Sequence, residues 1–197
     1  MAVDNSYPLV GMEQGAARIF TRAVDGGTDG AFEHLGTDVV ATGLEINRAC
    51  DVSARIVTET TDTLAVTEAL HDGKTIVMAM ADSPLAETTY TLPAATGSGA
   101  RFRFVVGAVN TANYIITVTG NDVLYGNVII NSTGDSPDLT EIYPTAADSD
   151  TVTLNGTTQG GAKIGDWLEF EDIAADTYTV RGMLTGSGTV VTPFSAT

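Results

Sequence analysis

Two histidines, one cysteine and several closely spaced carboxylates are the residues of this chain that could do chemistry. Nucleophilic catalysis needs a nucleophile, a base and a group that orients the base. His34 lies in a region without helix or strand periodicity, His71 begins an Asp-Gly turn, and neither is near a Gly-x-Ser-x-Gly motif. Cys50 follows an expected helix face, where it is typical of a small buried apolar residue. We therefore interpret both histidines as surface loop residues and predict no catalytic residue of this kind.

Pairs of carboxylates are the second candidate, because two of them can hydrolyse a glycosidic bond. Glu169 and Glu171 are two residues apart, as are Asp148 and Asp150. On a strand, such a pair points to one face. The glutamates alternate with apolar residues that we assign to the core, so their face is the one in solvent. We expect exposed carboxylates here and predict that the protein is not an enzyme.

Calcium binding is the third candidate. The stretch 25–30 has Asp at the first and fifth positions and Gly at the sixth, as in an EF-hand loop, but its third position is Gly27 and its twelfth would be Gly36. Four further aspartates flank an expected β region: Asp135, Asp138, Asp148 and Asp150. We interpret them as a solvated acidic surface. The prediction is therefore no metal and no cofactor.

The composition excludes several classes of protein. The 197 residues include 25 Asp and Glu against 9 Lys and Arg, which gives a formal net charge of -16. This balance argues against a protein that binds nucleic acid or a membrane surface. A single cysteine excludes an internal disulfide framework. The first residues do not resemble a secretion signal, and no apolar run is long enough to span a membrane, so we expect a soluble protein made in a cytosol.

The elements that must position these residues are mainly strands, which begin at Val52. Several segments alternate polar and apolar residues or are rich in β-branched residues: 75–80, 101–104, 114–118, 124–130 (interrupted by Gly126), 151–154, 168–171 and 177–181. Turn signals rich in Gly, Asn and Asp separate them. About ten short strands at this spacing are typical of an all-β protein. We predict a jelly-roll or β-sandwich body over residues 52–197, with Phe102 and Phe104 in its core.

Residues 1–51 lack this alternation. Thr42-Gly43-Leu44-Glu45 fits a capping box, which predicts a short linker helix over residues 43–51. Before it, apolar residues are scattered without a clear element, which is typical of an extended arm that buries its side chains on another surface. The predicted interface with a partner or a neighbouring subunit consists of Tyr7, Leu9, Met12, Ile19, Phe20, Phe32 and Leu35. The alternative is that the arm folds back onto its own body.

Two groups of residues resemble a known family. Asp72-Gly73-Lys74-Thr75-Ile76-Val77-Met78 precedes Thr91-Leu92-Pro93-Ala94-Ala95, which leads through Gly-Ser-Gly into Ala100-Arg101-Phe102-Arg103-Phe104-Val105-Val106-Gly107. This succession, with 41–47 as the linker helix, resembles the β module of small tailed-phage virion proteins, namely capsid decoration (cement) and head-fibre proteins. The resemblance covers about residues 41–130.

The resemblance implies a structural protein without catalytic residues. A decoration protein of this kind would form a homotrimer and bind the major capsid protein on the outer surface of the head. Its acidic body would not compete for packaged DNA.

Three alternatives remain open. One is an adaptor at the base of a head or tail fibre. The second is a carbohydrate-binding β-sandwich that uses Trp167, Tyr125 or Tyr143 for stacking, although we favour packing for the single tryptophan. The third is a β-helix or jelly-roll enzyme that acts on polysaccharide.

Overall fold

The chain divides into two compact units, Met1–Asp51 and Val52–Thr197. The computed structural model describes residues 32–34, 37–39, 55–80, 87–110, 112–134 and 139–197. In the first unit, β1 (Phe32–His34) pairs antiparallel with β2 (Thr37–Val39), a hairpin that the lack of alternation did not predict. The helix expected over residues 43–51 and most of the expected arm lie outside the described residues.

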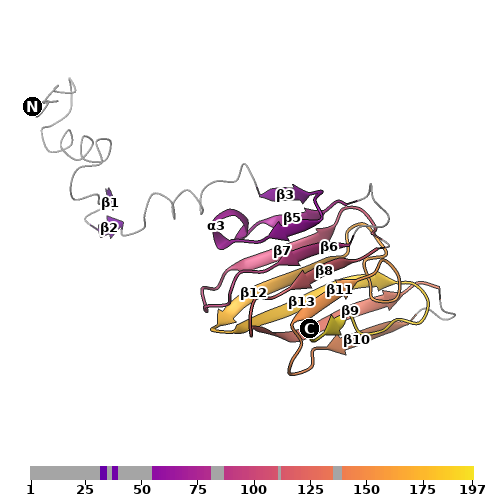
Figure 1. Ribbon diagram of the computed structural model, residues 1–197. Coiled ribbons are helices and arrows are strands. Elements are labelled where there is room, and N and C mark those ends of the chain that lie inside the picture. The colour runs from indigo at the N-terminus through magenta and orange to yellow at the C-terminus, as the bar shows by residue number, and fades with distance from the viewer. Residues whose placement is uncertain (1–31, 35–36, 40–54, 81–86, 111, 135–138) are drawn as a thin grey trace, which may run out of the picture. The chain divides into compact units, whose positions relative to one another are not determined.

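The second unit is a β-sandwich, as predicted (Figure 1). Its seven-stranded sheet has the order β10-β9-β13-β12-β7-β5-β3, and its five-stranded sheet has the order β14-β11-β8-β6-β4. The strands of the first sheet are β3 (Ile56–Glu59), β5 (Thr75–Met78), β7 (Arg101–Val106), β9 (Val123–Ser132), β10 (Thr140–Pro144), β12 (Trp167–Ala174) and β13 (Thr177–Gly186). Those of the second are β4 (Thr63–Ala65), β6 (Thr88–Thr91), β8 (Tyr114–Thr117), β11 (Thr151–Leu154) and β14 (Phe194–Ser195). The described part of this unit thus has twelve strands rather than about ten.

The first six strands of this unit alternate between the two sheets. In sequence order, β3, β5 and β7 belong to the seven-stranded sheet, and β4, β6 and β8 belong to the five-stranded sheet. Strands that are neighbours in one sheet run parallel, because each is reached by a crossing through the other sheet. Jelly rolls are built from antiparallel strands. Of the two architectures that the sequence left open, the structure therefore shows the sandwich.

The last strands complete the seven-stranded sheet by mixed pairing and the five-stranded sheet by antiparallel pairing. β12 pairs antiparallel with β7 and with β13, and β13 pairs parallel with β9. Asp176 has a φ of 59° in the turn between β12 and β13, a conformation that Asp tolerates better than most residues. The sequence predicted an interruption of strand β9 at Gly126. The structure shows none, because the ladder between β9 and β13 continues through Gly126. Its φ of 148° and the nearby Val180 carbonyl leave room for glycine alone.

The core lies between the two sheets and is rich in aromatic side chains. Phe102 and Phe104 are fully buried, as the alternation with Arg101 and Arg103 predicted. Tyr90 of the opposite sheet meets Phe104 edge to face, with 5.4 Å between ring centroids. Further buried side chains include Ile76, Met78, Leu92, Tyr114, Ile116, Leu124, Ile130, Val152, Leu154, Leu168, Phe170, Tyr178 and Leu184. A core of this kind fixes which side of each strand faces water.

A buried carboxylate connects the loop after β6 to β12. Asp172 accepts hydrogen bonds from the backbone N–H groups of Thr96, Gly97 and Ser98, at 2.9, 2.7 and 3.1 Å. The Ser98 hydroxyl donates to the same carboxylate at 2.9 Å. Burial alone would raise the pKa of Asp172, but these hydrogen bonds hold its pKa below the ordinary value. The loop that leads into β7 is thereby fixed to the sheet.

Candidate protein-docking face

The residues predicted to contact a partner lie almost entirely outside the described part of the chain. Phe32 is the exception, and its backbone pairs with that of Val39 in the hairpin of the first unit. The positions outside the described residues are Tyr7, Leu9, Met12, Ile19, Phe20 and Leu35. Their proposed role in binding therefore stays a prediction. The described residues instead bring together a different set of side chains, on the seven-stranded sheet.

An apolar row crosses the outer face of this sheet. The strand registers place one residue from each of six adjacent strands in a line: Ile142, Ile129, Met183, Trp167, Val105 and Val77. Ile142 is 65% exposed and Met183 is 47% exposed, and the other four are partly exposed. At a strand spacing of about 4.8 Å, the seven strands span roughly 29 Å. We call this surface, with the charged residues described next, the sheet face.

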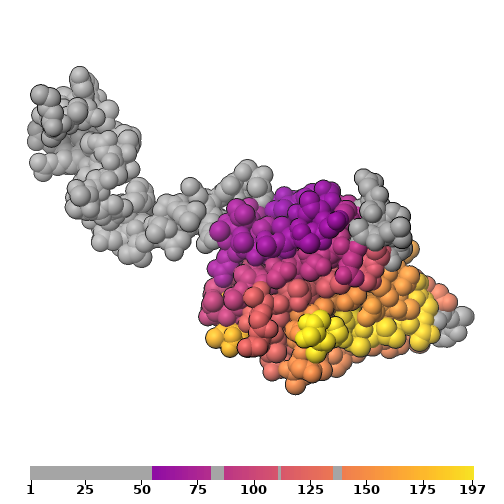
Figure 2. Space-filling model, in the orientation of Figure 1, coloured from indigo at the N-terminus to yellow at the C-terminus, as the bar shows by residue number. Residues whose placement is uncertain are grey.

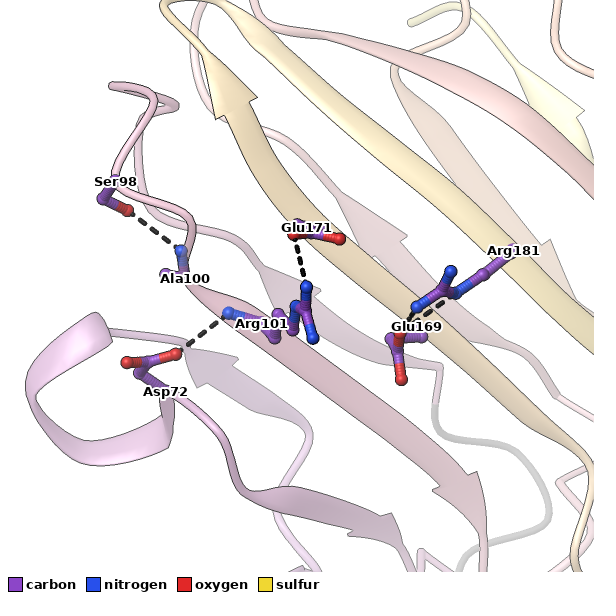
Figure 3. A network of polar contacts seen from close by, with 7 residues as sticks. All are labelled: Asp72, Ser98, Ala100, Arg101, Glu169, Glu171 and Arg181. Carbon is purple, nitrogen blue, oxygen red and sulfur yellow. Dashed lines mark hydrogen bonds and ion pairs between the residues drawn. The ribbon is translucent and has the colours of Figure 1, made fainter. Parts of the chain in front are cut away.

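In the two rows beside the apolar row, a glutamate of β12 forms an ion pair with an arginine of a neighbouring strand (Figure 3). Arg181 of β13 donates to Glu169 of β12, with 3.0 Å between Nε and Oε1. One row further, Arg101 of β7 forms an ion pair with Glu171 of β12 at 2.8 Å. Both pairs are direct register partners on adjacent strands, the arrangement in which opposite charges stabilise a sheet. They confirm that the two glutamates lie on the solvent side of the sheet, as predicted, where each forms an ion pair with an arginine.

Trp167 and Arg103 form the centre of the sheet face. The Arg103 guanidinium carbon lies 5.2 Å from the centroid of the Trp167 ring, within the range of a cation–π contact. Glu169, which is the register partner of Arg103 on β12, bonds instead to Arg181. Among the described residues, no carboxylate lies within ion-pair distance of Arg103. Tryptophan and arginine side by side are typical of the residues that contribute most to protein–protein binding.

Asp166 fixes the strand start that presents Trp167. Its carboxylate accepts hydrogen bonds from the Thr185 backbone N–H at 2.8 Å and from the Thr185 hydroxyl at 2.9 Å. Its backbone carbonyl accepts from Val106 N at 2.8 Å. Burial raises the pKa of Asp166, and the hydrogen bonds from Thr185 oppose that shift only in part. Strand β12 is therefore held between β7 and β13 at the position of the tryptophan.

The outer face of the five-stranded sheet has a different composition. The positions on its outer side in β4, β6, β8 and β11 are Thr63, Ala65, Thr89, Thr91, Ile115, Thr117, Thr151 and Thr153, of which Thr151 is buried. Threonine is common on the solvent side of strands, where its branched side chain packs against its neighbours and its hydroxyl is solvated. Thr151 donates to the Thr117 hydroxyl at 3.2 Å across two of these strands. Of the two described sheet surfaces, only that of the seven-stranded sheet exposes a line of large apolar residues.

Two of the other candidates from the sequence, His71 and Asp150, have structural roles. His71 was predicted on the surface but is 5% exposed, and its Nδ1 accepts a hydrogen bond from Thr67 N at 3.0 Å in the short helix α3 (Glu68–His71). Burial lowers the pKa of His71.

Asp150 accepts hydrogen bonds from the N–H and hydroxyl of Thr197 and so binds the end of the chain. Asp148 is exposed, and Asp135 and Asp138 lie outside the described residues. Among described residues, no group of three or more His, Cys, Asp or Glu side chains could hold a metal ion.

The three aromatic residues considered for carbohydrate stacking do not form one platform. Trp167 and Tyr125 share the sheet face, but the register separates them by two strands and two rows, or roughly 16 Å. Tyr143 shares the inner side with Val128, and its hydroxyl donates to the Val190 carbonyl at 2.8 Å. This spacing does not favour stacking on one sugar ring.

The apolar row was not identified from the sequence, although a signal for it exists. Three of its members are the middle residues of apolar triplets: Val77 in 76–78, Val105 in 104–106 and Ile129 in 128–130. On a strand with one buried face, the middle residue of such a triplet must point outward. Outward apolar residues on three separate strands indicate a surface that binds another molecule.

The comparisons with known proteins give no family for this chain, so the sheet face is the main structural evidence on its function. In the described part of the chain, no helix is long and apolar enough to cross a membrane. No protein-family model, no curated protein and no solved structure matches this chain.

Proposed function

We propose that this protein is a structural virion protein: a trimeric capsid decoration (cement) protein that binds the outside of a phage head and stabilises the shell. The observation that best supports a structural role is the apolar row on the sheet face, with Trp167 and Arg103 at its centre. Exposed apolar patches of this extent on soluble proteins are typical of surfaces that bind other proteins. The phage setting comes from the resemblance of residues 41–130 to decoration and head-fibre proteins.

The residues of that resemblance form two adjacent strands of the seven-stranded sheet. Residues 75–78 form β5 and residues 101–106 form β7, and these two strands are parallel neighbours. Ile76, Phe102 and Phe104 are completely buried. The inward residues of the resembling motif therefore belong to the core, whereas its outward residues Val77, Val105 and Arg103 belong to the sheet face.

The charge of the chain agrees with a position on the outside of a head. A net charge of -16 disfavours contact with packaged DNA. We propose that the major capsid protein is the partner and that Tyr7, Leu9, Met12, Ile19, Phe20, Phe32 and Leu35 supply the contacts to it. Three linked copies of such a segment would bind far more tightly than one, because the second and third contacts are intramolecular.

Sedimentation with purified heads tests this proposal. Undecorated heads of the phage that encodes the chain are mixed with the full chain and with a variant in which Leu9, Met12, Ile19 and Phe20 are serine. A matched control replaces four polar residues of the same segment with serine. We expect the full chain and the control to sediment with heads and to raise the melting temperature of the shell, and the apolar variant to do neither. Heads that bind none of the three proteins would contradict the proposal.

A further inference from the structure

We infer that the sheet face is the surface through which copies of this chain contact one another, each sheet face receiving an acidic surface of the next copy. The inference rests on the trimer in the proposed function and names the contact that builds it. The proposed capsid contacts in residues 1–41 are separate from it.

The distribution of charge distinguishes the sheet face from the rest of the body. The sheet face contains Arg101, Arg103 and Arg181 against Glu169 and Glu171. The other described residues from 55 onward include twelve Asp or Glu, of which Asp122, Asp166 and Asp172 are buried, and only three Lys or Arg. Two bodies that approach through their acidic surfaces repel each other. The sheet face is the described surface on which an acidic neighbour can dock without this repulsion.

The same charges favour a contact between unlike surfaces. Two sheet faces placed against each other would bring six arginines together with four glutamates. An acidic surface on the sheet face supplies a carboxylate to Arg103, which contacts the Trp167 ring and, in the described part of the chain, has no carboxylate within ion-pair distance. Contacts between unlike surfaces close into a ring when the rotation between copies permits it, and three copies are the number proposed here.

The area of the sheet face is sufficient for such a contact. A surface of about 29 by 20 Å covers roughly 600 Å² on each partner, or about 1,200 Å² in total. This is the lower limit for a specific interface. A ring of three has three such contacts, so that loss of one copy requires two of them to break.

The test compares the full chain with two variants that have the same change in charge and polarity. Met183→Glu places a carboxylate in the apolar row, where the wild-type side chain is 47% exposed. Leu70→Glu makes the matched change on α3, where the side chain is 62% exposed. Because both positions are exposed, both variants should keep the circular dichroism spectrum and melting curve of the folded chain. Mass is measured by light scattering over a dilution series.

We expect the full chain and Leu70→Glu to have three times the mass of one chain, and the dissociation constant of Met183→Glu to be at least about tenfold higher. A Met183→Glu variant that associates as the full chain does would overturn the inference. A monomeric full chain would also overturn it. Head binding, measured on the same samples, separates the two proposals: a monomer that still sediments with heads contradicts the trimer and leaves the capsid contact standing. A Met183→Glu variant that keeps three times the mass of one chain but no longer sediments with heads would place the sheet face against the shell and overturn the inference.

Discussion

At the scale of single residues, one carboxylate determines how the loop before β7 is held. In an Asp172→Asn variant, one of the two oxygens becomes an N–H donor. That donor must face either the Gly97 N–H or those of Thr96 and Ser98. A buried donor without an acceptor costs about 1–3 kcal/mol, and the hydrogen bonds to a charged acceptor are lost in addition. We expect the variant to lose about 2–3 kcal/mol of unfolding free energy in urea denaturation at pH 7.

The control for this change is Asp176→Asn, four residues along the same hairpin. Asp176 is exposed, and asparagine also tolerates its φ of 59°. It should change the unfolding free energy by less than about 0.5 kcal/mol. Equal effects of the two substitutions would show that the hydrogen bonds to Asp172 contribute little.

The pH dependence of stability provides a second test of Asp172. Its folded-state pKa is lower than the ordinary value of 3.8, so the unfolded chain takes up the proton first as the pH falls. The contribution of this carboxylate is complete above the ordinary pKa and is lost as the pH falls through the lowered one. Asp166, with a raised pKa, acts in the opposite direction. We therefore expect the difference in stability between wild type and Asp172→Asn to shrink between pH 5 and pH 3. A constant difference would contradict the lowered pKa.

Gly126 is the residue at which backbone geometry restricts the side chain most. A Cβ atom built there would lie 1.9 Å from the Val180 carbonyl oxygen, which belongs to the neighbouring strand. Gly120 also has a positive φ, of 67°, but a Cβ there meets nothing within 4 Å. We expect Gly126→Ala to cost more than about 3 kcal/mol and Gly120→Ala about 1 kcal/mol. Chemical denaturation measures both, and similar costs would mean that β9 shifts easily away from β13.

At the scale of elements, the assignment of faces can be tested by one change at two adjacent residues of β7. Val106 is buried and Val105 lies in the apolar row. Threonine has nearly the shape of valine, so Val→Thr changes mainly the polarity. A buried hydroxyl without a partner costs about 1–3 kcal/mol, whereas an exposed one costs little. We expect Val106→Thr to destabilise the monomer and Val105→Thr to leave its unfolding free energy unchanged, at concentrations too low for association. The reverse order would place β7 with its other side to the core.

The strands and their inner faces were predictable because alternation reports burial directly. Phe102, Phe104, Leu168 and Phe170 were assigned to the core from this pattern alone, and all are fully buried. His71 was assigned wrongly, because an Asp-Gly turn indicates a bend in the chain but not what packs over the residue before it. Its burial depends on α3, a four-residue helix too short to give a periodic signal.

Strand pairing was not predictable in the same way. β5 pairs in parallel with both β3 and β7, although β4 and β6 of the other sheet lie between them in the sequence. Alternation in one strand specifies which side is buried, but it contains no information on which strand becomes the neighbour. The apolar row depends on those neighbours, since Val77, Val105 and Trp167 lie side by side only through the ladders of β5, β7 and β12. The sheet face therefore became visible only with the register.

At the scale of the whole molecule, the acidic surface governs how closely two copies approach. The space-filling view shows the described body as one continuous surface, from β3 to the C-terminal residues (Figure 2). Each chain has a net charge of -16, so two copies repel each other over long distances before the sheet face can make contact. The Debye length is about 30 Å in 10 mM salt and about 8 Å in 150 mM salt. At the lower salt concentration, repulsion thus extends over a distance comparable to the width of the sheet face.

The inferred contact therefore has a definite salt dependence. Between 10 and 150 mM sodium chloride, screening removes most of the long-range repulsion, while the apolar contacts of Met183, Trp167 and Ile129 are unaffected. We expect the dissociation constant of the full chain to fall over this range in a light-scattering dilution series. Sucrose of equal osmolality serves as the control, because it does not screen charge; as an excluded osmolyte it should lower the constant much less than the salt does. Screening weakens attraction between charges as well as repulsion. Association that weakens as salt rises would therefore show that ion pairs between copies, such as one between Arg103 and a carboxylate of the next copy, dominate the contact.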